Sequence, residues 1–420
     1  MDIFSFLRSL DLFGVMALFW YTTFLEIPRY VIGAVAVAVA KLFTRPVPTF
    51  PANVRLTMLL VGHNEAAALR ACVEGLAEQT IAQERGPFEI VVVDDGSTDR
   101  MAEIARELQR EGKIHRFARV HQRGGKSAGI NLGFSLCTGD IVVILDIDTT
   151  LDRDALSMIL AYFDDPDVGG VSGDIGVRNA TRSLLTRFQT IEYAVGVSLG
   201  RRIVETMGIL SMVSGAFGAF RRSAVDSVGG SDVEVGEDAD LTLKLRRAGW
   251  KIRFAPDARA LTDVPERLVA LTGQRLRWDR GIITIWLRKF RSSLDPRMAT
   301  FRLSDAFVIL DAFVFQALLA FALPVYVIWL FYEYGEFAWT ILGATLVGYA
   351  VLDMVSFMAA AAVAPVNVFW LVPYLPFYTL MQVTVMRVIR LVALVQELFF
   401  RSSYRDPYVP ARVMLQVDRI

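Results

Sequence analysis

Short apolar runs that end in polar or acidic residues alternate with amphipathic stretches through the first part of the chain. The runs are rich in Val, Ile and Leu and cover residues 54–62, 88–97, 140–148 and 168–174. Stretches with helical spacing of apolar residues lie between them, as in residues 65–79 and 98–112. This alternation predicts an α/β fold around a mostly parallel sheet. In such sheets ligands bind at the carboxyl ends of the strands.

Longer apolar tracts dominate the second half of the chain. They cover residues 305–333, 337–364 and 366–400, and a shorter, interrupted tract covers residues 11–43. A helix needs ~20 such residues to cross the ~30 Å hydrocarbon core of a bilayer. We therefore predict an integral membrane protein with an α-helical transmembrane bundle. The first two long tracts are expected to be spans. The third is either one span or a re-entrant segment followed by a span, and the N-terminal tract is either two short helices or an interfacial helix followed by a span.

Residues around these tracts indicate their orientation and their polar contacts. Lys41 and Arg45 follow the N-terminal tract, and basic residues just after a span favour the cytoplasmic side for what comes next. The N-terminus lacks the basic, apolar and small-residue order of a cleavable signal peptide. Gln316, Asp353 and Gln382 lie inside the apolar tracts. They are predicted either to line a wet channel or to form interhelical hydrogen bonds.

The chain has two amphipathic stretches. Residues 181–212 lie within the last part of the α/β pattern, and residues 264–292 lie between that pattern and the long apolar tracts. The first is predicted to be a helix lying on the surface. The chain is thus divided into an N-terminal membrane segment with a linker (1–50), an α/β domain (51–263), interface helices (264–304), a transmembrane bundle (305–400) and a polar tail (401–420).

Composition limits the classes of partner. The chain has 44 Lys and Arg against 44 Asp and Glu, so its net charge gives no reason to expect nucleic acid as a partner. Its two cysteines, Cys72 and Cys137, are far apart. They provide neither a disulfide framework nor the spacing of a metal site, as expected for a reducing compartment.

Two of the predicted strands have a pair of aspartates at their C-terminal end. Asp94 and Asp95 precede Gly-Ser, where their carboxylates could accept hydrogen bonds from a nucleotide or simply form a tight turn before a capped helix. Asp146 and Asp148 are separated by one residue, so on an extended strand end both carboxylates point to the same side. Two carboxylates on one face suit a hard divalent cation that also holds substrate phosphates.

Three further motifs could contribute to a site that binds a phosphate-containing ligand. Lys126 follows Gly124-Gly125, a pair that permits close approach of the backbone to a phosphate. Gly215 lies in a run of small residues that would line a narrow passage. Glu237 and Asp238 precede an apolar-periodic segment, where they could stabilise a helix N-terminus. Asp238 could instead act as a general base that removes a proton from a hydroxyl group.

The stretch QRLRW lies about two dozen residues before the long apolar tracts. On a helix Gln274, Arg277 and Trp278 share one face. Arg277 could bind phosphate oxygens in a forked geometry, and Trp278 offers a flat wall for stacking against a sugar. A basic helix attracted to anionic lipid would also explain the arginines, and Arg275 and Arg280, which lie off this face, could face lipid headgroups.

The order of these motifs (DDGS, DxD, Glu-Asp, then Gln-x-x-Arg-Trp before a membrane bundle) resembles the membrane-bound processive family 2 glycosyltransferases. That group includes cellulose, hyaluronan, chitin-oligosaccharide and poly-N-acetylglucosamine synthases. The resemblance runs from about residue 54 to residue 290 and more loosely through the membrane segments. It implies a cytosolic catalytic domain of the GT-A, Rossmann-like type.

The resemblance also implies a role for each matching residue. Asp95, with Asp94, would contact the uridine of a UDP-sugar, and Asn64 and Glu65 would line the same pocket. Asp146 and Asp148 would form the metal and diphosphate site, with Asp148 the more direct ligand, and Lys126 would lie near the nucleotide. Asp238, paired with Glu237, would deprotonate the acceptor. The diphosphate and the acceptor sugar would be held by Gln274, Arg277 and Trp278.

By the same resemblance, the enzyme would polymerise a β-linked polysaccharide from UDP-N-acetylglucosamine or UDP-glucose, with inversion and with Mg²⁺ or Mn²⁺. It would pass the polymer across the inner (plasma) membrane as a multi-pass protein. Its partners would be the donor, the growing polysaccharide, membrane lipid and accessory export subunits. The alternative is a non-processive transferase that adds one sugar to a lipid. Two departures, His63 in the strand-end motif and Gly236 before the acidic pair, leave the sugar open.

Overall fold

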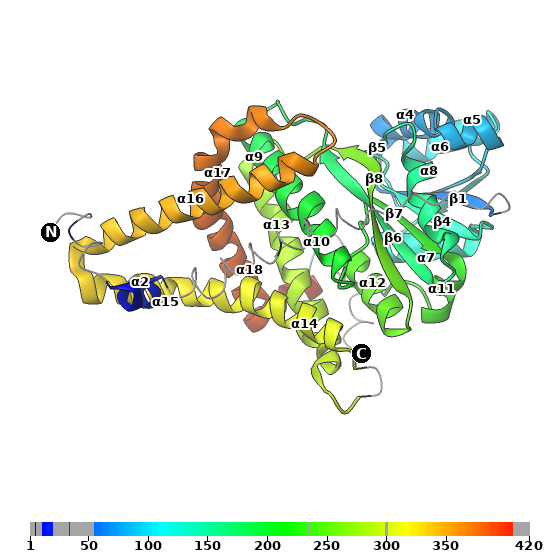
Figure 1. Cartoon of the computed structure of the whole chain (residues 1–420). Coiled ribbons are helices and arrows are strands. Elements are labelled where there is room, and N and C mark those ends of the chain that lie inside the picture. The colour runs from blue at the N-terminus through cyan, green and yellow to red at the C-terminus, as the bar shows by residue number, and fades with distance from the viewer. Residues whose placement is uncertain are drawn as a thin grey trace.

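The computed structural model describes residues 5, 11–19, 33, 54–232, 236–298 and 301–405. Figure 1 shows a helix-covered sheet on one side and a long helical hairpin on the other, with further helices between them. The predicted N-terminal membrane segment (1–50) is described only at residues 5, 11–19 and 33, and the polar tail (401–420) only at residues 401–405. The rest of both segments lies outside the described residues.

One eight-stranded sheet forms the core of the α/β domain. In spatial order its strands are β3 (Arg116–Val120), β2 (Glu89–Asp95), β1 (Leu56–Gly62), β4 (Ile141–Leu145), β7 (Phe217–Arg221), β6 (Val168–Val177), β8 (Lys251–Thr262) and β5 (Thr150–Leu151). The first four are parallel, as predicted. β7 is antiparallel to both of its neighbours, and β5 is antiparallel to β8. The sheet is therefore mixed.

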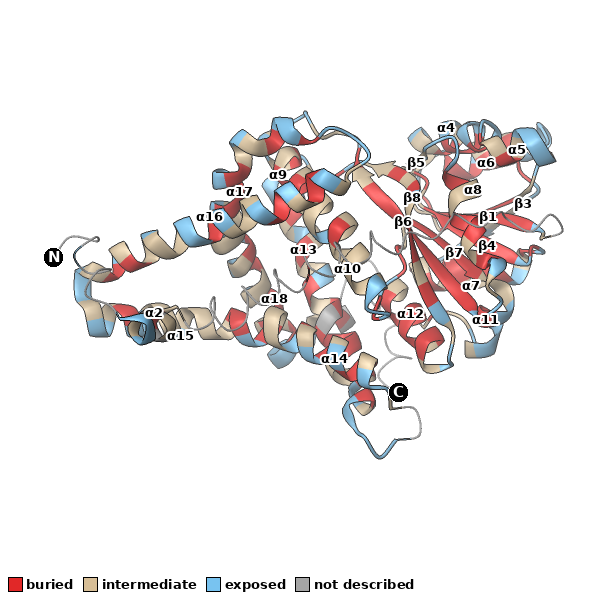
Figure 2. Ribbon diagram, viewed as in Figure 1, coloured by how far each residue is buried: buried red, intermediate tan, exposed pale blue. Residues whose placement is uncertain are grey.

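Helices cover both faces of this sheet, which explains why its central strands are continuous apolar runs. Along β1, Met58 and Leu60 pack on one side and Leu59 and Val61 on the other. The first side carries α4 (Ala66–Ala77), α5 (Thr80–Arg85), α6 (Met101–Arg110) and α8 (Ala155–Leu160). The second carries α7 (Lys126–Leu136), α11 (Arg222–Val228) and α12 (Glu237–Arg247). Figure 2 shows the buried strands between these layers.

Two long helical segments connect the sheet to the rest of the molecule. The first runs from α9 (Leu184–Glu192) through the π-helical η3 (Tyr193–Leu199) to α10 (Gly200–Thr206). Ser183 and Thr186 form a capping box that starts it. Its apolar residues Phe188 and Ile191 pack against the helices that follow in the second half of the chain. The prediction of a surface-lying helix at residues 181–212 is therefore wrong for this face, because other helices cover it.

The second segment is α13 (Leu268–Ile282), continued by the π-helical η4 (Ile283–Lys289) and the short η5 (Arg291–Leu294). It lies against α18 (Arg387–Phe400), which is the last part of a helical run that includes η8 (Phe369–Tyr374), α17 (Leu375–Met381) and η9 (Gln382–Met386). The third predicted membrane tract, residues 366–400, is this run. It lies beside the interface helix that carries the QRLRW stretch.

The other two predicted spans correspond to the two arms of the hairpin in Figure 1. The arms are α14 (Leu303–Ala312) with η6 (Phe313–Leu318) and α15 (Leu319–Tyr334), and α16 (Ala338–Val363). Gly335, with φ 54°, breaks the helix where the chain turns back through η7 (Gly335–Phe337). Within the described residues, Leu303–Val363 is the one helical run long and apolar enough to cross a membrane, with a mean hydropathy of 2.3 in its most apolar window. α2 (Leu12–Leu18) lies near the end of the hairpin, where the Tyr326 hydroxyl donates to the Leu18 carbonyl (3.1 Å).

Candidate active site

The DDGS turn after β2 is held by internal hydrogen bonds. Asp94 is fully buried, accepts the Ser97 backbone N–H (2.8 Å) and pairs with Arg119 (3.2 Å). Asp95 accepts the backbone N–H groups of Gly124 (2.7 Å) and Gly125 (2.9 Å). The tight-turn interpretation thus describes Asp94, and Asp95 fixes the glycine loop that precedes Lys126.

Asn64 connects the end of β1 to the same turn. It has a left-handed backbone, with φ 62°, and its side-chain oxygen accepts the N–H groups of Thr98 (2.8 Å) and Asp99 (3.3 Å). Asp99 in turn accepts the N–H of Ala66 at the start of α4 (3.0 Å) and of Met101 at the start of α6 (3.0 Å). In this structure, therefore, the Asn64 side-chain oxygen binds the turn that follows β2.

A group of carboxylates lies where β1 and β4 end. The chain turns directly after Leu145, with the Asp146 carbonyl accepting the Thr149 N–H (3.0 Å). The expectation that Asp146 and Asp148 share the face of an extended strand is therefore wrong. They nevertheless interact electrostatically: burial and then Asp146 raise the pKa of Asp148. Burial, Asp148 and Asp146 likewise raise the pKa of Glu65 to about 7.

Lys126, at the start of α7, joins this group to the acidic pair of α12. Its Nζ lies 2.6 Å from Asp146 Oδ1, 3.7 Å from Glu237 Oε1 and 3.2 Å from the Gly215 carbonyl oxygen. Burial alone would lower the pKa of Lys126, but Asp146 and Glu237 raise it above its ordinary value. A Cβ at Gly215 would lie 3.2 Å from Nζ, so the absence of a side chain there allows the close approach.

The acidic pair occupies the first turn of α12, which begins after Gly236 in a left-handed conformation (φ 95°). Burial raises the pKa of Glu237, and Lys126 partly offsets that effect. Asp238 Oδ1 accepts the Ala239 backbone N–H (2.8 Å). A helix N-terminus is thus present, as one alternative predicted. The same turn also lies within ion-pair distance of Lys126, so the pair belongs to the strand-end site as well.

Trp278, on α13, is 45% exposed and lies beside a buried arginine. Arg275 pairs with Glu192 of α9 (2.8 Å), and its guanidinium lies 4.4 Å from the centre of the Trp278 ring. Arg280 donates to Gln396 of α18. The prediction that Arg275 and Arg280 face lipid headgroups is therefore wrong, because α9 and α18 cover that side of α13. Gln274 Oε1 is buried and accepts no hydrogen bond from the described residues.

Residues of the first helical segment lie between α13 and the strand-end acids. The Tyr193 hydroxyl is within electrostatic reach of both Arg275 and Asp148. Arg201 donates to Ser172 Oγ (3.1 Å) and lies within electrostatic reach of Asp174 and Asp238. No sequence motif marks Tyr193 or Arg201, because the pattern around them predicts only a surface helix.

The strand-end site fits a divalent cation that is shared with a substrate. No group of three or more His, Cys, Asp or Glu residues that could hold a metal ion occurs among the described residues. Asp146 and Asp148 are therefore too few ligands for a self-contained metal site. Mg²⁺ in particular is commonly held by one or two carboxylates together with substrate phosphates and water. The mutual repulsion of Glu65, Asp146 and Asp148 gives such a cation a favourable field.

Comparison with known proteins decides the type of domain. Residues 59–229 match the model of the glycosyl transferase family 2. This part of the chain is a family 2 glycosyltransferase domain. The chain is similar in fold to a mannosyltransferase from Pyrobaculum calidifontis, solved with GDP-Man and Mn²⁺, with a TM-score of 0.60 and 19% identity over 88% of this chain and 96% of that one. The predicted GT-A-type, Rossmann-like domain is thereby confirmed, and so is its classification as a glycosyltransferase.

Two curated relatives from staphylococci carry the same name. The chain is 33% identical over 244 residues to the poly-beta-1,6-N-acetyl-D-glucosamine synthase of Staphylococcus aureus (strain COL). It is 31% identical over 244 residues to the synthase of the same name from Staphylococcus epidermidis. Each match covers 58% of this chain and 58% of the relative, so the chain spans little more than half the length of these proteins. The resemblance to membrane-bound processive family 2 glycosyltransferases is borne out at this level.

Proposed function

We propose that this chain is a processive, inverting glycosyltransferase that polymerises a β-linked polysaccharide from a UDP-sugar and passes it across the membrane. The observation that carries the proposal is the convergence of Asp146, Asp148, Lys126 and the Glu237-Asp238 pair at one edge of the family 2 domain. UDP-N-acetylglucosamine is the first donor to test, because the curated relatives are named as poly-N-acetylglucosamine synthases.

In this mechanism the donor diphosphate lies between the strand ends and α7. Asp146 and Asp148 would hold Mg²⁺ or Mn²⁺, which when bound neutralises charge on the diphosphate leaving group. The mannosyltransferase of similar fold was solved with Mn²⁺, which supports this assignment. Lys126 Nζ pairs with the Asp146 carboxylate in the structure. When the donor binds, Nζ would pair with a donor phosphate instead, since carboxylate and phosphate both offer anionic oxygens to an ammonium group.

The acceptor side of the site is assigned to Glu237 and Asp238. Asp238, in the first turn of α12, would accept the proton of the attacking hydroxyl group as the general base. The Lys126–Glu237 pair (3.7 Å) orients this turn towards the donor. Attack from the side opposite the leaving group converts an α-linked donor into a β-linked product.

Processivity and translocation are assigned to α13 and the helices beside it. Trp278 offers an exposed ring for the acceptor sugar, and Arg275 supports the ring from its buried side. Gln274 and Arg277 share that helix face and would contact the diphosphate and the acceptor. The apolar hairpin Leu303–Val363 and the run up to α18 would form the membrane part, with the catalytic domain in the cytoplasm.

The test is a donor screen on the full-length chain in detergent, with UDP release and product length measured for UDP-N-acetylglucosamine, UDP-glucose and UDP-glucuronate. One donor is expected to give polymer in the presence of Mg²⁺ or Mn²⁺. Asp238→Asn should reduce turnover by a factor of ~10² to 10⁴, the usual contribution of a general base.

The matched control is Asp226→Asn, which makes the same chemical change on the exposed part of α11. It should leave turnover unchanged. Full turnover in Asp238→Asn would refute the assignment of the base. Products that stop after a single added sugar on a lipid would refute processivity and favour the non-processive alternative.

A further inference from the structure

The helical segment that carries the QRLRW stretch continues beyond it and reaches the acidic pair of α12. Its π-helical end, η4, packs directly on α12, where Ile285 and Trp286 form one buried cluster with Ala239. Ala239 follows Asp238 in the chain, so this apolar contact lies at the turn that carries the proposed base. The segment therefore extends from Trp278, the proposed stacking ring for the acceptor, to the proposed base.

Two features of this contact favour glycine before the acidic pair. Gly236 has a φ of 95°, a left-handed conformation that residues with a side chain rarely adopt. A Cβ at this position would also lie 2.6 Å from Ile285 Cδ1, closer than two carbon atoms pack. The departure from the family pattern at Gly236 thus has a cause in the packing of η4 on α12, which does not involve the sugar.

Ion pairs add to the apolar contact. Lys289, the last residue of η4, pairs with Asp240 (2.6 Å) and with Asp232. Asp240 is fully buried and lies in the same first turn of α12 as Asp238. The Asp232 backbone N–H donates to the Asp240 carboxylate (3.2 Å), and Lys244 pairs with Asp232 (3.0 Å). One ammonium group thus holds two carboxylates that lie on either side of the proposed base in the sequence.

Burial makes this ammonium group important to the turn. Burial alone would raise the pKa of Asp232, but hydrogen bonds from Lys289 and Lys244 lower it below its ordinary value. The side chain of Asp240 has no exposed surface. Removal of the Lys289 ammonium would leave this carboxylate buried without its cation, which is costly. We therefore expect the first turn of α12 to move when Lys289 is replaced by a neutral residue.

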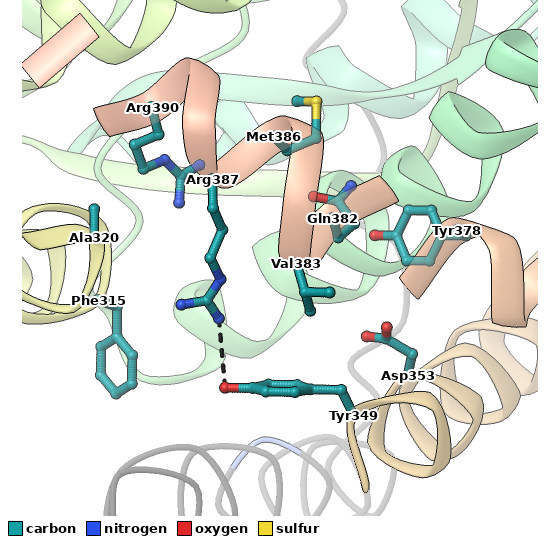
Figure 3. Close-up of a pocket in the computed structure, with 10 residues that line it drawn as sticks. All are labelled: Phe315, Ala320, Tyr349, Asp353, Tyr378, Gln382, Val383, Met386, Arg387 and Arg390. Carbon is teal, nitrogen blue, oxygen red and sulfur yellow. Dashed lines mark hydrogen bonds between the residues drawn. The ribbon is translucent and has the colours of Figure 1, made fainter. Parts of the chain in front are cut away.

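The QRLRW helix is also fixed on its other side, by the proposed membrane part. Figure 3 shows Arg390 extending from α18. Its Nε bonds Asp279 of α13 (3.3 Å), the residue that follows Trp278. The helical segment is thus held by α18 beside the stacking ring and by α12 at its end. Both contacts are needed to fix the ring relative to the base.

We propose that Lys289 is a positioning residue for sugar transfer: through Asp240 it fixes the first turn of α12, and with it the base, relative to the QRLRW helix. This inference rests on the function proposed above, which assigns the base to Asp238 and the acceptor sugar to Trp278. The hydroxyl group of an acceptor stacked on the ring has to reach the base and the donor at the same time. Lys289 contacts neither substrate and acts only on this alignment.

The kinetic test is Lys289→Gln in the full-length chain in detergent, with the donor that the screen above identifies. The kcat for polymer formation should fall roughly 10- to 100-fold, the scale expected when a reacting group is misplaced by about 1 Å. The donor KM should stay unchanged, because the donor is held at the strand ends. Lys289→Arg keeps a positive charge between the two carboxylates and should recover most of the lost rate.

The matched control is Lys251→Gln at the start of β8. Lys251 also pairs with two aspartates, Asp165 (3.0 Å) and Asp167 (2.9 Å), but its side chain is 52% exposed. This variant loses the same kind of ion pairs away from the site. It should keep the kcat and the donor KM of the wild type.

Amide hydrogen exchange without any donor tests the contact independently of catalysis. Exchange in the first turn of α12 should be faster in Lys289→Gln than in the wild type and unchanged in Lys251→Gln. Asp232→Asn is a milder variant, because it leaves the buried pair between Lys289 and Asp240 in place. It should give a smaller increase in exchange and a smaller loss of kcat, and it decides the matter if Lys289→Gln does not fold.

Several outcomes would overturn the proposal. Full kcat in Lys289→Gln would do so, and so would a raised donor KM with an unchanged kcat, since Lys289 would then act on donor binding. A loss in Lys289→Arg as large as that in Lys289→Gln would exclude the ion pairs as the cause. Unchanged exchange in both Lys289→Gln and Asp232→Asn would refute the contact itself. If the wild type formed no polymer from any donor, the function proposed above would be contradicted, while the exchange measurement would still decide the Lys289 contact.

Discussion

The carboxyl ends of β1, β2 and β4 and the interface between α13 and α18 both concentrate charged side chains, and they satisfy these charges in different ways. At the strand ends, burial and the neighbouring carboxylates raise the pKa values of Glu65 and Asp148. Lys126 is the cation that contacts Asp146 there. The group has more negative than positive charge, which is the condition that favours binding of a metal ion with a diphosphate.

At the helix interface, three charged side chains of α13 and η4 each meet an oppositely charged partner. Arg275 pairs with Glu192, Asp279 with Arg390, and Arg288 with Glu397. Glu397 is fully buried and also accepts the Ser403 backbone N–H (2.8 Å). Such pairs gain little net stability when formed but are expensive to break, because one charge is then left buried without a partner. The strand-end charges thus suit the binding of a ligand, whereas the charges at the helix interface hold one helix against another.

Removing one side of an interface pair should give the largest change in stability. Glu397→Ala leaves Arg288 without its buried carboxylate, and we expect a loss of about 3–5 kcal/mol in the free energy of unfolding. Thermal unfolding in detergent, followed by tryptophan fluorescence or circular dichroism, would detect this loss. UDP release should fall as α13 loses its support from α18.

Glu333→Ala is the matched control, because it removes the same side chain from an exposed position on α15. Its unfolding should match that of the wild type. If Glu397→Ala and Glu333→Ala unfolded alike, the interface pair would not fix α13, and the contrast between the two regions would fail.

The central strands and the helices around them could be predicted because burial on both faces leaves a continuous apolar run with polar ends. β7 was not predicted as a strand, since its Phe217–Arg221 stretch is rich in small residues and its partners β4 and β6 come from other parts of the chain. Its antiparallel direction follows from those pairings. The local sequence pattern carries no information on these strand pairings.

The residue types of the site could also be predicted, but several contacts could not. Asn64 bonds the backbone of Thr98, and Asp95 bonds that of Gly125, across separations of about thirty residues. Helical spacing places Arg275 and Trp278 on α13 but does not reveal that α9 covers the Arg275 side. Long-range packing decides which of two faces is exposed, which is why the lipid-facing interpretation of Arg275 was wrong.

A smaller, pH-dependent effect should mark the excess of negative charge among the strand-end acids. The pKa of Glu65 is raised to about 7, so the folded state holds this proton more tightly than the unfolded state. Its contribution to stability is therefore present below pH ~4.5 and is lost as the pH rises through about 7. In buffer with a metal chelator, Glu65→Gln should gain about 1–2 kcal/mol over the wild type above pH 7, less than the full shift implies because the side chain is partly exposed.

Chemical denaturation of both proteins at pH 5.5 and pH 8.5 would measure this difference. Added Mg²⁺ should reduce it, because a cation at the site stabilises the ionised Glu65 carboxylate. Parallel pH profiles for wild type and Glu65→Gln would show that the acids at the strand ends do not repel one another. The two regions would then handle charge in the same way.

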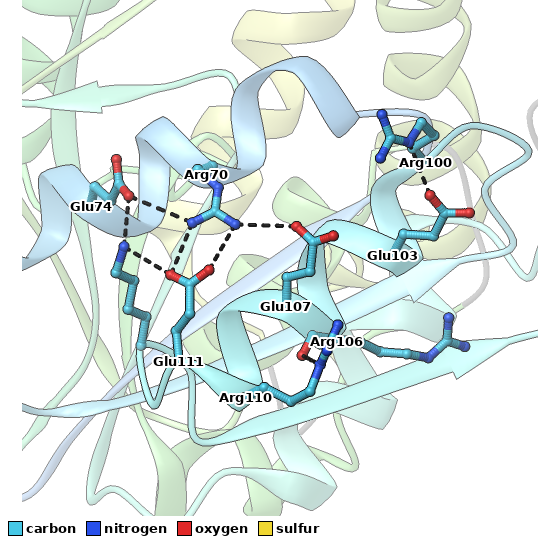
Figure 4. A network of polar contacts seen from close by, with 9 residues as sticks. Arg70, Glu74, Arg100, Glu103, Arg106, Glu107, Arg110 and Glu111 are labelled. Carbon is cyan, nitrogen blue, oxygen red and sulfur yellow. Dashed lines mark hydrogen bonds and ion pairs between the residues drawn. The ribbon is translucent and has the colours of Figure 1, made fainter.

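The smallest effect is expected on the outer face of α4 and α6, where charges are paired but exposed to solvent. Arg70 lies between Glu107 and Glu111, as Figure 4 shows. Lys113 contacts Glu74 and Glu111. Hydrogen bonds from Arg70 and Lys113 lower the pKa of Glu111 to about 2. Any contribution of this carboxylate is therefore present above pH ~4.5 and lost as the pH falls towards 2. Because water and salt screen such pairs, Glu111→Gln should unfold within error of the wild type at pH 7 in 1 M salt. A loss comparable to that of Glu397→Ala would mean that pairing alone, without burial, fixes helices in this protein.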